Sequence, residues 1–465
     1  MRGLPIGYSQ SGKRLRYETI RNGKKRPGES SMILIGPARG GKGTDVLVPM
    51  LMEYEASIIV LSAKPDLCAI TADHRHKRLK QDIVVVNAFN VEPDYIGHLP
   101  HCGFNPLDTL DPRSDAFGVD CDAQAESIVQ IDAQESQKHF PESGQMLVSG
   151  VIMGIVKYAP PGKKTLVTAY DVTCGGGFFE FAREMDAKGD ALLSGRLGRF
   201  AAAGAAENRE IASMHSSAVT AFRFMGNSAV MRLLSPEKGQ RILSWETLRK
   251  RPTTVYVIVP VEYLTACSRV LRLAVTSAIM RLLAHTNGLP VLLMMDEFAA
   301  LGHMAIIENT MALSAGLNLT MLPVLQDACQ LKQLYGDRMH SFLSCAGCQL
   351  LLPPRDPVTA RLISDLCGQT EVIAQSHSVT IDRISGEPQV NDSASQYARK
   401  LMLPDEVSAL GRDDMLIKVE SLPDVIHAKR KPYYAAREYD GQWSPDPYHD
   451  GKKKRSGGFL RWVGW

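Results

Sequence analysis

The stretch that decides the fold is "SMILIGPARGGKGTDVLVPMLMEY", which covers Ser31–Tyr54. A short apolar run leads into glycines and small residues, a lysine follows, and a second apolar segment then begins. The loop fits the pattern G-x-x-x-x-G-K through Gly36, Gly41 and Lys42. This pattern predicts a buried strand, then a phosphate-binding loop, then a helix. The alternative is a glycine-rich turn that binds no ligand.

The chemistry of such a loop explains its composition. Glycines let the backbone curl so that successive N–H groups point at one anion, and the following helix adds its N-terminal partial charge. Lys42 supplies a mobile cation for the β- and γ-phosphates of ATP. The residue after the lysine is Gly43 where the plain motif has Ser or Thr, so we assign the Mg²⁺-binding hydroxyl to Thr44. The predicted nucleotide-binding residues are Gly36, Pro37, Ala38, Arg39, Gly40, Gly41, Lys42, Gly43 and Thr44.

A second motif supplies carboxylates. In "VLLMMDEF" an apolar run leads directly into Asp296 and Glu297. Two adjacent carboxylates at the end of so apolar a strand are costly unless a cation or ordered water is there to meet them. We therefore predict that Asp296 organises Mg²⁺ and that Glu297 polarises the attacking water. The alternative is an acidic helix cap beyond a core strand.

A glutamine completes the candidate site. The apolar run "LTMLPVLQ" ends in Gln326. At the tip of a neighbouring strand, this side chain would contact the γ-phosphate and sense its loss. A surface glutamine is the alternative.

The order of the segments predicts an α/β fold with an insertion. Short apolar runs that read as strands occur before about residue 90 and return after residue 252, which favours a mostly parallel sheet covered by helices. Between them the apolar residues have helical spacing, so we predict an all-α insertion. Ser376–Gln396 is polar and weakly alternating, which indicates an exposed hairpin or loop. The predicted division is a nucleotide-binding domain in two parts, 1–111 and 249–440, an all-α domain, 112–248, and a basic and aromatic tail, 441–465.

The overall charge of the chain excludes few classes of function. The formal net charge is +3, so contact with nucleic acid has to come from local basic patches. We read the basic segments Ser11–Gly28 and Gly451–Gly458 as solvated tails. The densest internal basic run is "DHRHKRLKQD", which is either the exposed face of a helix or a DNA contact; its basic residues are Arg75, His76, Lys77, Arg78 and Lys80.

In this order the motifs resemble those of the type IV coupling proteins, the TraG/TraD-type ATPases of conjugation and type IV secretion. "GPARGGKGTDVLVPML" is similar to the family's P-loop, "MMDEFAALG" to its Walker B motif and "LQDACQLKQLYG" to its glutamine motif. "FNPLD" and "LMLPDEVSAL" also resemble family landmarks. The resemblance covers most of the chain, and the helical insertion fits the all-α domain of the family.

The resemblance implies a RecA-like motor that forms a hexameric ring and hydrolyses ATP between subunits. Its substrates would be single-stranded DNA with an attached relaxase, secreted effector proteins, or both. It would deliver them to the components of a type IV secretion channel, with the all-α domain receiving the substrate. The implied location is the cytoplasm, at the inner face of the bacterial inner membrane.

Two departures from the family pattern stand out. No apolar stretch reaches the roughly 18 residues that span a bilayer. We therefore expect either a trimmed piece or a variant recruited by a separate membrane anchor protein, with a monomer in isolation. The second departure is that Ala299–Leu325 contains neither arginine nor lysine, although the resemblance places a catalytic arginine there. Arg355 and Arg361 are later candidates, and we favour solvated charges for both.

Two other functions compete with an export motor. One is a cytosolic double-stranded DNA translocase of the FtsK/HerA type. The other is a substrate-receptor adaptor that binds nucleotide but turns it over little. The all-α insertion and the spacing of the later motifs favour export.

Overall fold

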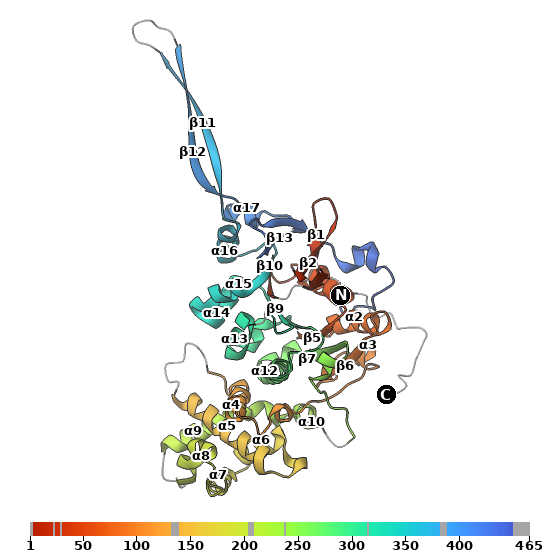
Figure 1. The fold of residues 1–465 in the computed structure, drawn as a ribbon, viewed down its shortest axis with the longest axis vertical. Coiled ribbons are helices and arrows are strands. Elements are labelled where there is room, and N and C mark those ends of the chain that lie inside the picture. The colour runs from red at the N-terminus through yellow and green to blue at the C-terminus, as the bar shows by residue number, and fades with distance from the viewer. Residues whose placement is uncertain are drawn as a thin grey trace.

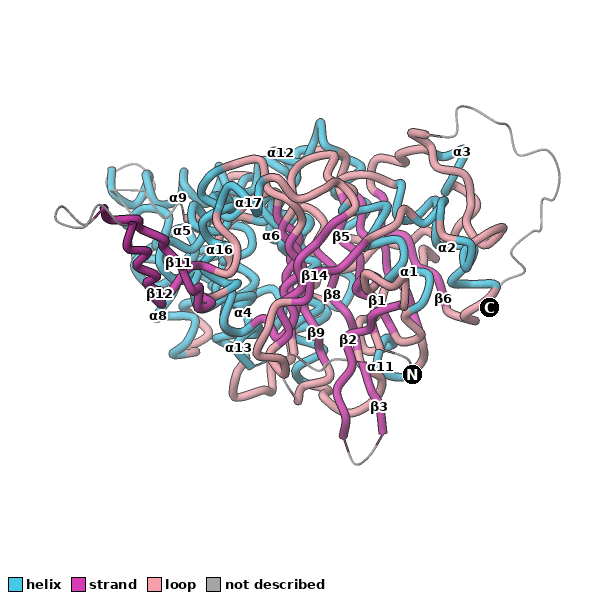
Figure 2. The backbone as a smooth tube through the Cα atoms, turned by 90° about the horizontal axis from the view of Figure 1, so that it is seen from above, coloured by secondary structure: helices cyan, strands magenta, loops and turns pink. Residues whose placement is uncertain are grey.

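The computed structural model describes residues 3–21, 24–27, 30–131, 139–202, 209–236, 239–313, 316–381 and 388–449. A 12-stranded sheet runs through the centre of the molecule (Figures 1 and 2). In spatial order its strands are β3 (Lys24–Pro27), β2 (Arg14–Arg21), β1 (Leu4–Tyr8), β14 (Ile426–Lys429), β13 (Asp414–Val419), β10 (Ala346–Leu351), β4 (Ser31–Ile35), β9 (Leu319–Leu325), β8 (Val291–Met295), β5 (Ser57–Ser62), β7 (Thr253–Ile258) and β6 (Asp82–Asn87).

The sheet has two halves with different strand directions. From β10 to β6 every neighbouring pair is parallel. From β3 to β10 every pair is antiparallel. The expected fold class, an α/β sheet that is mostly parallel and is interrupted by helices, is confirmed. The antiparallel half was not expected from the sequence.

Alternate residues of the parallel strands face two different cores. Ile33 and Ile35 point into one apolar cluster, while Met32 and Leu34 point into the other, and all four are fully buried. A strand covered on both faces has to be apolar throughout, which is why these strands were visible as continuous apolar runs. The first cluster continues without a break into the helical insertion.

Helices cover both faces of the sheet. On one face lie α1 (Val48–Glu53) and α2 (Asp66–Lys77), whose apolar residues belong to the second cluster. On the other face lies α12 (Val261–Ala284), a long helix whose buried residues belong to the first cluster. The remaining helices near the later strands are α13 (Ala305–Leu313), α14 (Ala328–Tyr335), α15 (Met339–Cys345), α16 (Pro357–Cys367) and α17 (Pro404–Ser408).

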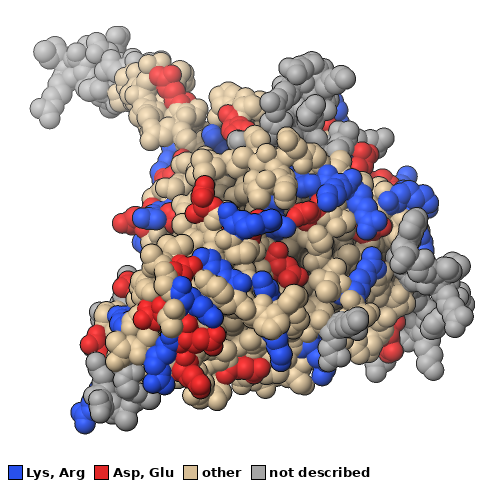
Figure 3. All heavy atoms as spheres, turned by 60° about the horizontal axis from the view of Figure 1, so that its bottom comes forward, with Lys and Arg blue, Asp and Glu red and all other residues tan. Residues whose placement is uncertain are grey.

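The insertion between β6 and β7 is helical; most of it lies at one end of the molecule, but its first helix lies beside α2 (Figure 1). Its helices are α3 (Pro93–Ile96), α4 (Phe117–Ile128), α5 (His139–Tyr158), α6 (Leu166–Cys174), α7 (Phe178–Asp186), α8 (Ala191–Ala202), α9 (Arg209–Ala221), α10 (Ser228–Leu234) and α11 (Thr247–Lys250). Seen from this end, lysine and arginine side chains are interspersed with aspartate and glutamate side chains (Figure 3). The role of the insertion as a separate recognition domain over 112–248 stays a prediction.

Helical spacing of the apolar residues over 208–234 predicts one helix, but the structure divides this segment. The helix α9 ends at Ala221, and a short 3₁₀ turn, Phe222–Gly226, precedes α10. The side chain of Asn227 accepts hydrogen bonds from the N–H groups of Ala229 and Val230 and so starts the new helix.

The basic run on α2 was interpreted wrongly at its first arginine. Arg75 is fully buried beneath the helix. Its guanidinium donates to the Thr254 hydroxyl at 2.6 Å and to the Gln81 side chain at 2.7 Å, and it also donates to backbone carbonyls, including that of Leu51. Arg75 is therefore neither an exposed charge nor a DNA contact; Lys77, Arg78 and Lys80 are exposed.

The first and last described segments of the chain are part of the sheet and its flank. The basic segment predicted to be a solvated tail forms β2 and β3 instead. Near the other end, the N–H of Ser444 donates to the carbonyl of Ile70 at 3.0 Å, and Trp443 packs against the second cluster. The predicted tail 441–465 therefore includes a packed part, 441–449, while Gly451–Gly458 and the aromatic end lie outside the described residues.

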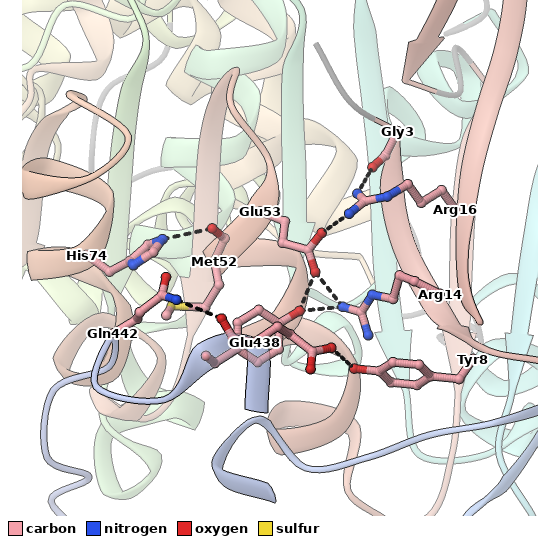
Figure 4. A network of polar contacts seen from close by, with 10 residues as sticks. Gly3, Tyr8, Arg14, Arg16, Met52, Glu53, His74, Glu438 and Gln442 are labelled. Carbon is pink, nitrogen blue, oxygen red and sulfur yellow. Dashed lines mark hydrogen bonds and ion pairs between the residues drawn. The ribbon is translucent and has the colours of Figure 1, made fainter. Parts of the chain in front are cut away.

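A network of polar contacts ties these ends to α1 (Figure 4). Glu53, the last residue of α1, accepts from Arg14 at 2.7 Å, from Arg16 and from the hydroxyl of Tyr439. The hydroxyl of Tyr8 donates to Glu438. The network links the first strands, the helix that follows the P-loop and the C-terminal segment.

The expected exposed hairpin is present and is longer than predicted. Strands β11 (Gln369–Ile381) and β12 (Pro388–Lys400) pair along 13 residues each and project away from the body of the molecule (Figure 1). Among the described residues, no helix has the length and apolar character that crossing a membrane requires.

Candidate functional site

The P-loop lies at the edge where the parallel strands end. It follows β4, and the N–H of Gly36 donates to the carbonyl of Leu325 at 3.1 Å, the last residue of neighbouring β9. A Cβ on Gly36 would lie 2.8 Å from Leu352, and Gly41 has φ of 90°. Both positions therefore suit glycine. The chain enters a helix at Lys42, through a π-helical turn over Lys42–Leu47 that leads into α1.

Lys42 sits inside the loop. Its ammonium group donates to the carbonyl of Gly36 at 2.7 Å and to that of Pro37 at 3.2 Å. Burial lowers the pKa of Lys42, while the negative charges of Asp296, Glu297 and Asp327 act in the opposite direction. The lysine and the two predicted carboxylates therefore occupy one electrostatic environment.

Asp296 and Glu297 follow β8 at the same edge. The N–H of Asp296 donates to the carbonyl of Leu61 at 2.9 Å, which places this residue beside the end of β5. Burial and the neighbouring charges of Glu297 and Asp66 raise the pKa of Asp296 to about 7. The pKa of Glu297 is also raised, chiefly by burial, against the effects of Lys42 and Lys64.

Gln326 lies between the other two motifs. It follows β9, the strand that separates β4 from β8, and its side chain is exposed at the sheet edge. Its N–H donates to the side chain of Gln330 at 2.8 Å, and Asp327 caps α14. The structure places Gln326 next to the P-loop strand, as expected.

Two charged residues at this edge were missed. Lys64 and Asp66 follow β5 in "SAKPDL", and both act electrostatically on Glu297. Burial raises the pKa of Asp66. The signal was present in the sequence, because Lys64 and Asp66 follow a largely apolar strand within four residues of its end.

The third missed residue comes from the opposite half of the sheet. Arg430, directly after β14, is 3% exposed. Its guanidinium donates to the carboxylate of Asp45 at 2.7 Å and to the carbonyl of Gly40 in the P-loop. A Cβ on Gly41 would collide with both side chains, at 2.3 Å from Asp45 and 2.5 Å from Arg430. Arg430 and Asp45 therefore hold the loop from outside.

Thr44 takes part in the same arrangement. Its hydroxyl donates to the second oxygen of Asp45 at 2.6 Å. A Cβ on Gly43 would meet nothing within 4 Å, so steric crowding is not the reason for a glycine where the plain motif has a hydroxyl. The hydroxyl available beside the lysine is that of Thr44.

The residues at this edge fit a magnesium nucleotide. Mg²⁺ prefers hard oxygen ligands and usually keeps several waters and substrate phosphates, so it needs only one or two protein groups. Asp296 is a partly buried carboxylate, and the Ser62 hydroxyl donates to it over a long 3.4 Å. A carboxylate that is partly shielded from water with so little compensation suits a cation. The described residues contain no group of three or more His, Cys, Asp or Glu side chains placed to hold a metal by themselves.

The family described as "Type IV secretory system Conjugative DNA transfer" matches residues 9–454. The chain belongs to this family. The coupling proteins that the sequence motifs resemble belong to this same family. The predicted resemblance is therefore confirmed at the level of the family.

Curated relatives agree with the conjugative DNA transfer family. The chain is 25% identical to the conjugal transfer protein TraG of Escherichia coli over 443 residues, which cover 88% of this chain and 68% of TraG. It is 22% identical to VirD4 of Agrobacterium fabrum over 420 residues, which cover 87% of this chain and 59% of VirD4. Among solved structures it is similar to the plasmid coupling protein TrwB in complex with ADP and Mg²⁺, with a TM-score of 0.66, 14% identity and coverage of 93% and 94%. This likeness confirms the predicted RecA-like P-loop fold.

The arginines considered as catalytic are exposed. Arg355 precedes α16 and Arg361 lies on it, and both side chains face solvent in the single chain. Activation by an arginine of a neighbouring subunit stays a prediction.

Proposed function

We propose that this protein is an ATP-hydrolysing coupling protein that uses the site at the parallel strand ends to move substrate toward a type IV secretion channel. One observation carries the proposal. Lys42 of the P-loop and the carboxylates of Asp296 and Glu297 at the end of β8 are close enough for their charges to shift one another's pKa. Family membership adds the context of conjugative DNA transfer.

The residues divide the work by their chemistry. Backbone N–H groups of the loop between Ala38 and Thr44 and the ammonium of Lys42 would bind and orient the phosphates. Asp296 and the Thr44 hydroxyl would hold Mg²⁺, which when bound neutralises charge on the phosphates. Glu297, whose pKa is raised by burial, is suited to orient the attacking water and receive its proton. Gln326 would contact the γ-phosphate from the adjoining strand.

Arg430 and Asp45 position the loop without touching the phosphates. Their ion pair is nearly inaccessible to solvent, with 2% and 8% of the two side chains exposed. Because Thr44 also bonds to Asp45, the pair affects both the loop carbonyl at Gly40 and the hydroxyl proposed for Mg²⁺. We assign Arg430 a positioning role on this basis.

The substrate and the assembly are proposals of the same kind. The family description supports DNA as cargo, in the form of a single strand with an attached relaxase; secreted effector proteins are the other candidate. By the implied mechanism the active state is a hexamer at the inner face of the bacterial inner membrane, recruited there by an anchor protein or by the channel components.

The test is phosphate release from ATP by the purified chain, with and without Mg²⁺, compared with the variant Lys42→Ala. We expect Mg²⁺-dependent hydrolysis that Lys42→Ala abolishes while the melting temperature stays within a few degrees. Hydrolysis by Lys42→Ala at the rate of the unaltered protein would contradict the proposal. Stimulation by single-stranded but not by double-stranded DNA would separate export from translocation of the FtsK/HerA type.

A further inference from the structure

An exposed apolar patch lies at the ends of β6 and β7, the two strands beyond β5. The helix α12 begins soon after β7, and the side chains of Val261 and Tyr263 in its first turn are 55% and 45% exposed. The ring of Tyr263 stacks on that of Phe89, just beyond β6, with 4.5 Å between the ring centroids. We call these three residues, a stacked pair of rings and a valine of the same helical turn, the apolar patch. Grouped apolar side chains at a surface mark sites of interaction.

The loop that carries Phe89 has a fixed shape. The side chain of Asn87 accepts from the N–H of Val91 at 3.1 Å and donates to the carbonyl of the same residue at 3.2 Å. Asn90 and Glu92 adopt left-handed backbone conformations, with φ of 49° and 45°. Such conformations cost free energy and persist where surrounding contacts hold them. A surface that is held in this way loses little conformational freedom when a ligand binds to it.

Two carboxylates flank the apolar patch. Glu262 stands between Val261 and Tyr263 in the sequence, and its side chain is exposed. Glu92 follows Phe89 in the braced loop. Among the residues that the structure describes, no lysine or arginine forms an ion pair with either carboxylate. A partner that fits this surface therefore combines apolar side chains with positive charge.

The C-terminal segment passes close to this surface. Tyr448 is 52% exposed, and the centre of its ring lies 5.8 Å from the ammonium group of Lys64, just beyond β5. Burial raises the pKa of the Tyr448 hydroxyl, and so do the negative charges of Asp66, Glu92 and Glu262. The chain beyond Tyr448 therefore starts among the carboxylates that flank the apolar patch.

The residues that follow have the composition that this surface requires. Residues 450–465 read "DGKKKRSGGFLRWVGW" and lie outside the described part of the chain. A block of four cations, Lys452–Arg455, comes first, and an aromatic and aliphatic block, 459–465, follows it. A segment as long as 450–458 can span up to about 30 Å, which leaves ample length to reach the patch beside Tyr448.

A basic and aromatic segment also suits an anionic membrane. The surroundings of Tyr448 argue against that ligand, because Glu92 and Glu262 would face lipid headgroups of the same sign. These carboxylates attract the cations of the segment instead. The charges on the page therefore favour the protein's own surface over a lipid surface.

We propose that residues 450–465 fold back onto the same chain, where their cations face Glu92 and Glu262 and their aromatic side chains cover the apolar patch. Tethering raises the effective concentration of a short segment to about the millimolar range, so weak contacts suffice to keep it docked. A partner that binds at the ends of β6 and β7 then has to displace it. The proposal goes beyond the proposed function and does not depend on it, because neither the docking nor its test involves a nucleotide.

The test is photo-crosslinking of the full chain with the substitution Phe459→benzoylphenylalanine. After irradiation, mass spectrometry should map most crosslinks to the peptides that contain Phe89 or Val261 and Tyr263. An equal mixture with isotopically heavy but otherwise identical protein distinguishes a crosslink within one chain from one between two copies. Crosslinks spread over other surfaces would overturn the site. Crosslinks mainly between light and heavy chains would overturn folding back onto the same chain and assign the surface to a second copy.

A pair of variants ties the crosslink to the patch. Val261→Ser/Tyr263→Ser removes exposed side chains and should fold normally, yet it should lower the yield of crosslinks to the Phe89 peptide about threefold or more. The matched control is Val358→Ser/Tyr397→Ser, which changes a valine and a tyrosine that are 44% and 50% exposed elsewhere in the molecule. An equal loss in the control would overturn the assignment to this patch.

The charges are tested separately. Glu92→Gln/Glu262→Gln should lower the yield about two- to fivefold in dilute salt and have little effect in concentrated salt. Glu55→Gln/Glu180→Gln changes two other exposed carboxylates and should have no effect at either salt concentration. An unchanged yield in the first variant would contradict the pairing of charges.

A lipid control decides between the two surfaces. Vesicles of phosphatidylcholine and phosphatidylserine, added before irradiation, should leave the crosslink yield unchanged. Loss of the crosslink in protein that sediments with these vesicles would overturn the proposal in favour of a membrane ligand.

Discussion

The two halves of the sheet differ in what they contribute to one site. The parallel half, from β10 to β6, carries Lys42, Asp296, Glu297 and Gln326 at the ends of its strands. The antiparallel half contributes no predicted catalytic group, yet Arg430 after β14 reaches across to the P-loop. The groups that we propose for catalysis thus come from one half of the sheet, and a residue that braces the P-loop comes from the other.

The difference in strand direction and burial explains why the two halves have such different sequence patterns. Parallel strands between two helical layers are buried on both faces and read as apolar runs, and polar residues at their ends are conspicuous. The antiparallel strands include charged residues, and their stability depends on contacts such as those of Glu53 with Arg14 and Arg16. Substitutions in the two halves should therefore have separable effects.

The largest expected effect lies in the parallel half. Glu297→Gln should reduce ATP hydrolysis about 10²- to 10⁴-fold, because the carboxylate is the group suited to receive a proton from water. Affinity for an ATP analogue should stay within about threefold, since Lys42 and the loop amides remain. Phosphate release and analogue titration are the measurements. Turnover that survives the substitution would favour the adaptor hypothesis over the motor.

The next effect belongs to the antiparallel half. Arg430→Gln should lower the free energy of unfolding by about 3–5 kcal/mol, because Asp45 is left buried without its partner. Burial already raises the pKa of Asp45 with Arg430 in place, so without Arg430 the carboxylate should take up a proton more readily. The loss should accordingly be larger at pH 8 than at pH 6, as measured by urea unfolding.

A double variant supplies the control for Arg430. Arg430→Gln/Asp45→Asn removes the unpaired carboxylate and should recover part of the stability and abolish the pH dependence of the loss. Affinity for the ATP analogue should remain about tenfold weaker in both variants if Arg430 positions the loop. Full recovery of affinity in the double variant would show that the arginine only neutralises Asp45.

A smaller effect on stability alone is expected at Glu53. Burial raises its pKa, but Arg14, the Tyr439 hydroxyl and Arg16 together outweigh burial and hold the pKa below its usual value. A depressed carboxylate pKa stabilises the fold above the unfolded value, and this contribution disappears as the pH falls through the folded value. Glu53→Gln should therefore cost about 1.5–3 kcal/mol at pH 7 and little below pH 4, in urea unfolding. A cost that is equal at both pH values would contradict this account, as would a change in nucleotide affinity.

The smallest expected effect is an increase in stability, whereas the preceding substitutions reduce activity or stability. The pKa of Asp296 is raised from 3.8 to about 7, so without nucleotide its ionisation opposes folding increasingly between these two pH values and fully above pH 7. Asp296→Asn should raise the melting temperature by a few degrees at pH 8.5 and leave it nearly unchanged at pH 3.5. Thermal unfolding at the two pH values, in the absence of Mg²⁺ and ATP, is the measurement. A destabilised variant at pH 8.5 would mean that the carboxylate is already compensated.

The parallel half was predictable because its signals are local. Each strand is a short apolar run, and the P-loop pattern and the acid pair occupy the ends of such runs. The broken helix was missed because α9 and α10 share helical spacing with the turn between them, and only the Asn227 cap distinguishes them.

The rest depends on partners distant in sequence. Arg430 follows the four-residue strand β14, "IHAK", which carries no apolar run. Arg75 stands in a run of basic residues and looks exposed, but its guanidinium donates to groups of β7, of α1 and of the loop after α1, which no local pattern reveals. A buried arginine bonded to backbone carbonyls has no counter-charge to search for in the sequence.

The contact between Arg430 and Gly40 joins residues 390 positions apart. During synthesis Gly40 is therefore made well before Arg430, which follows it 390 residues later. The loop therefore cannot gain its final set of contacts on a partly translated chain, and folding of this site is a late, long-range event. A truncated translation product that ends before β14 would contain the P-loop motif, Asp296 and Glu297. Its P-loop would nevertheless lack the contacts that Arg430 makes with Gly40 and Asp45.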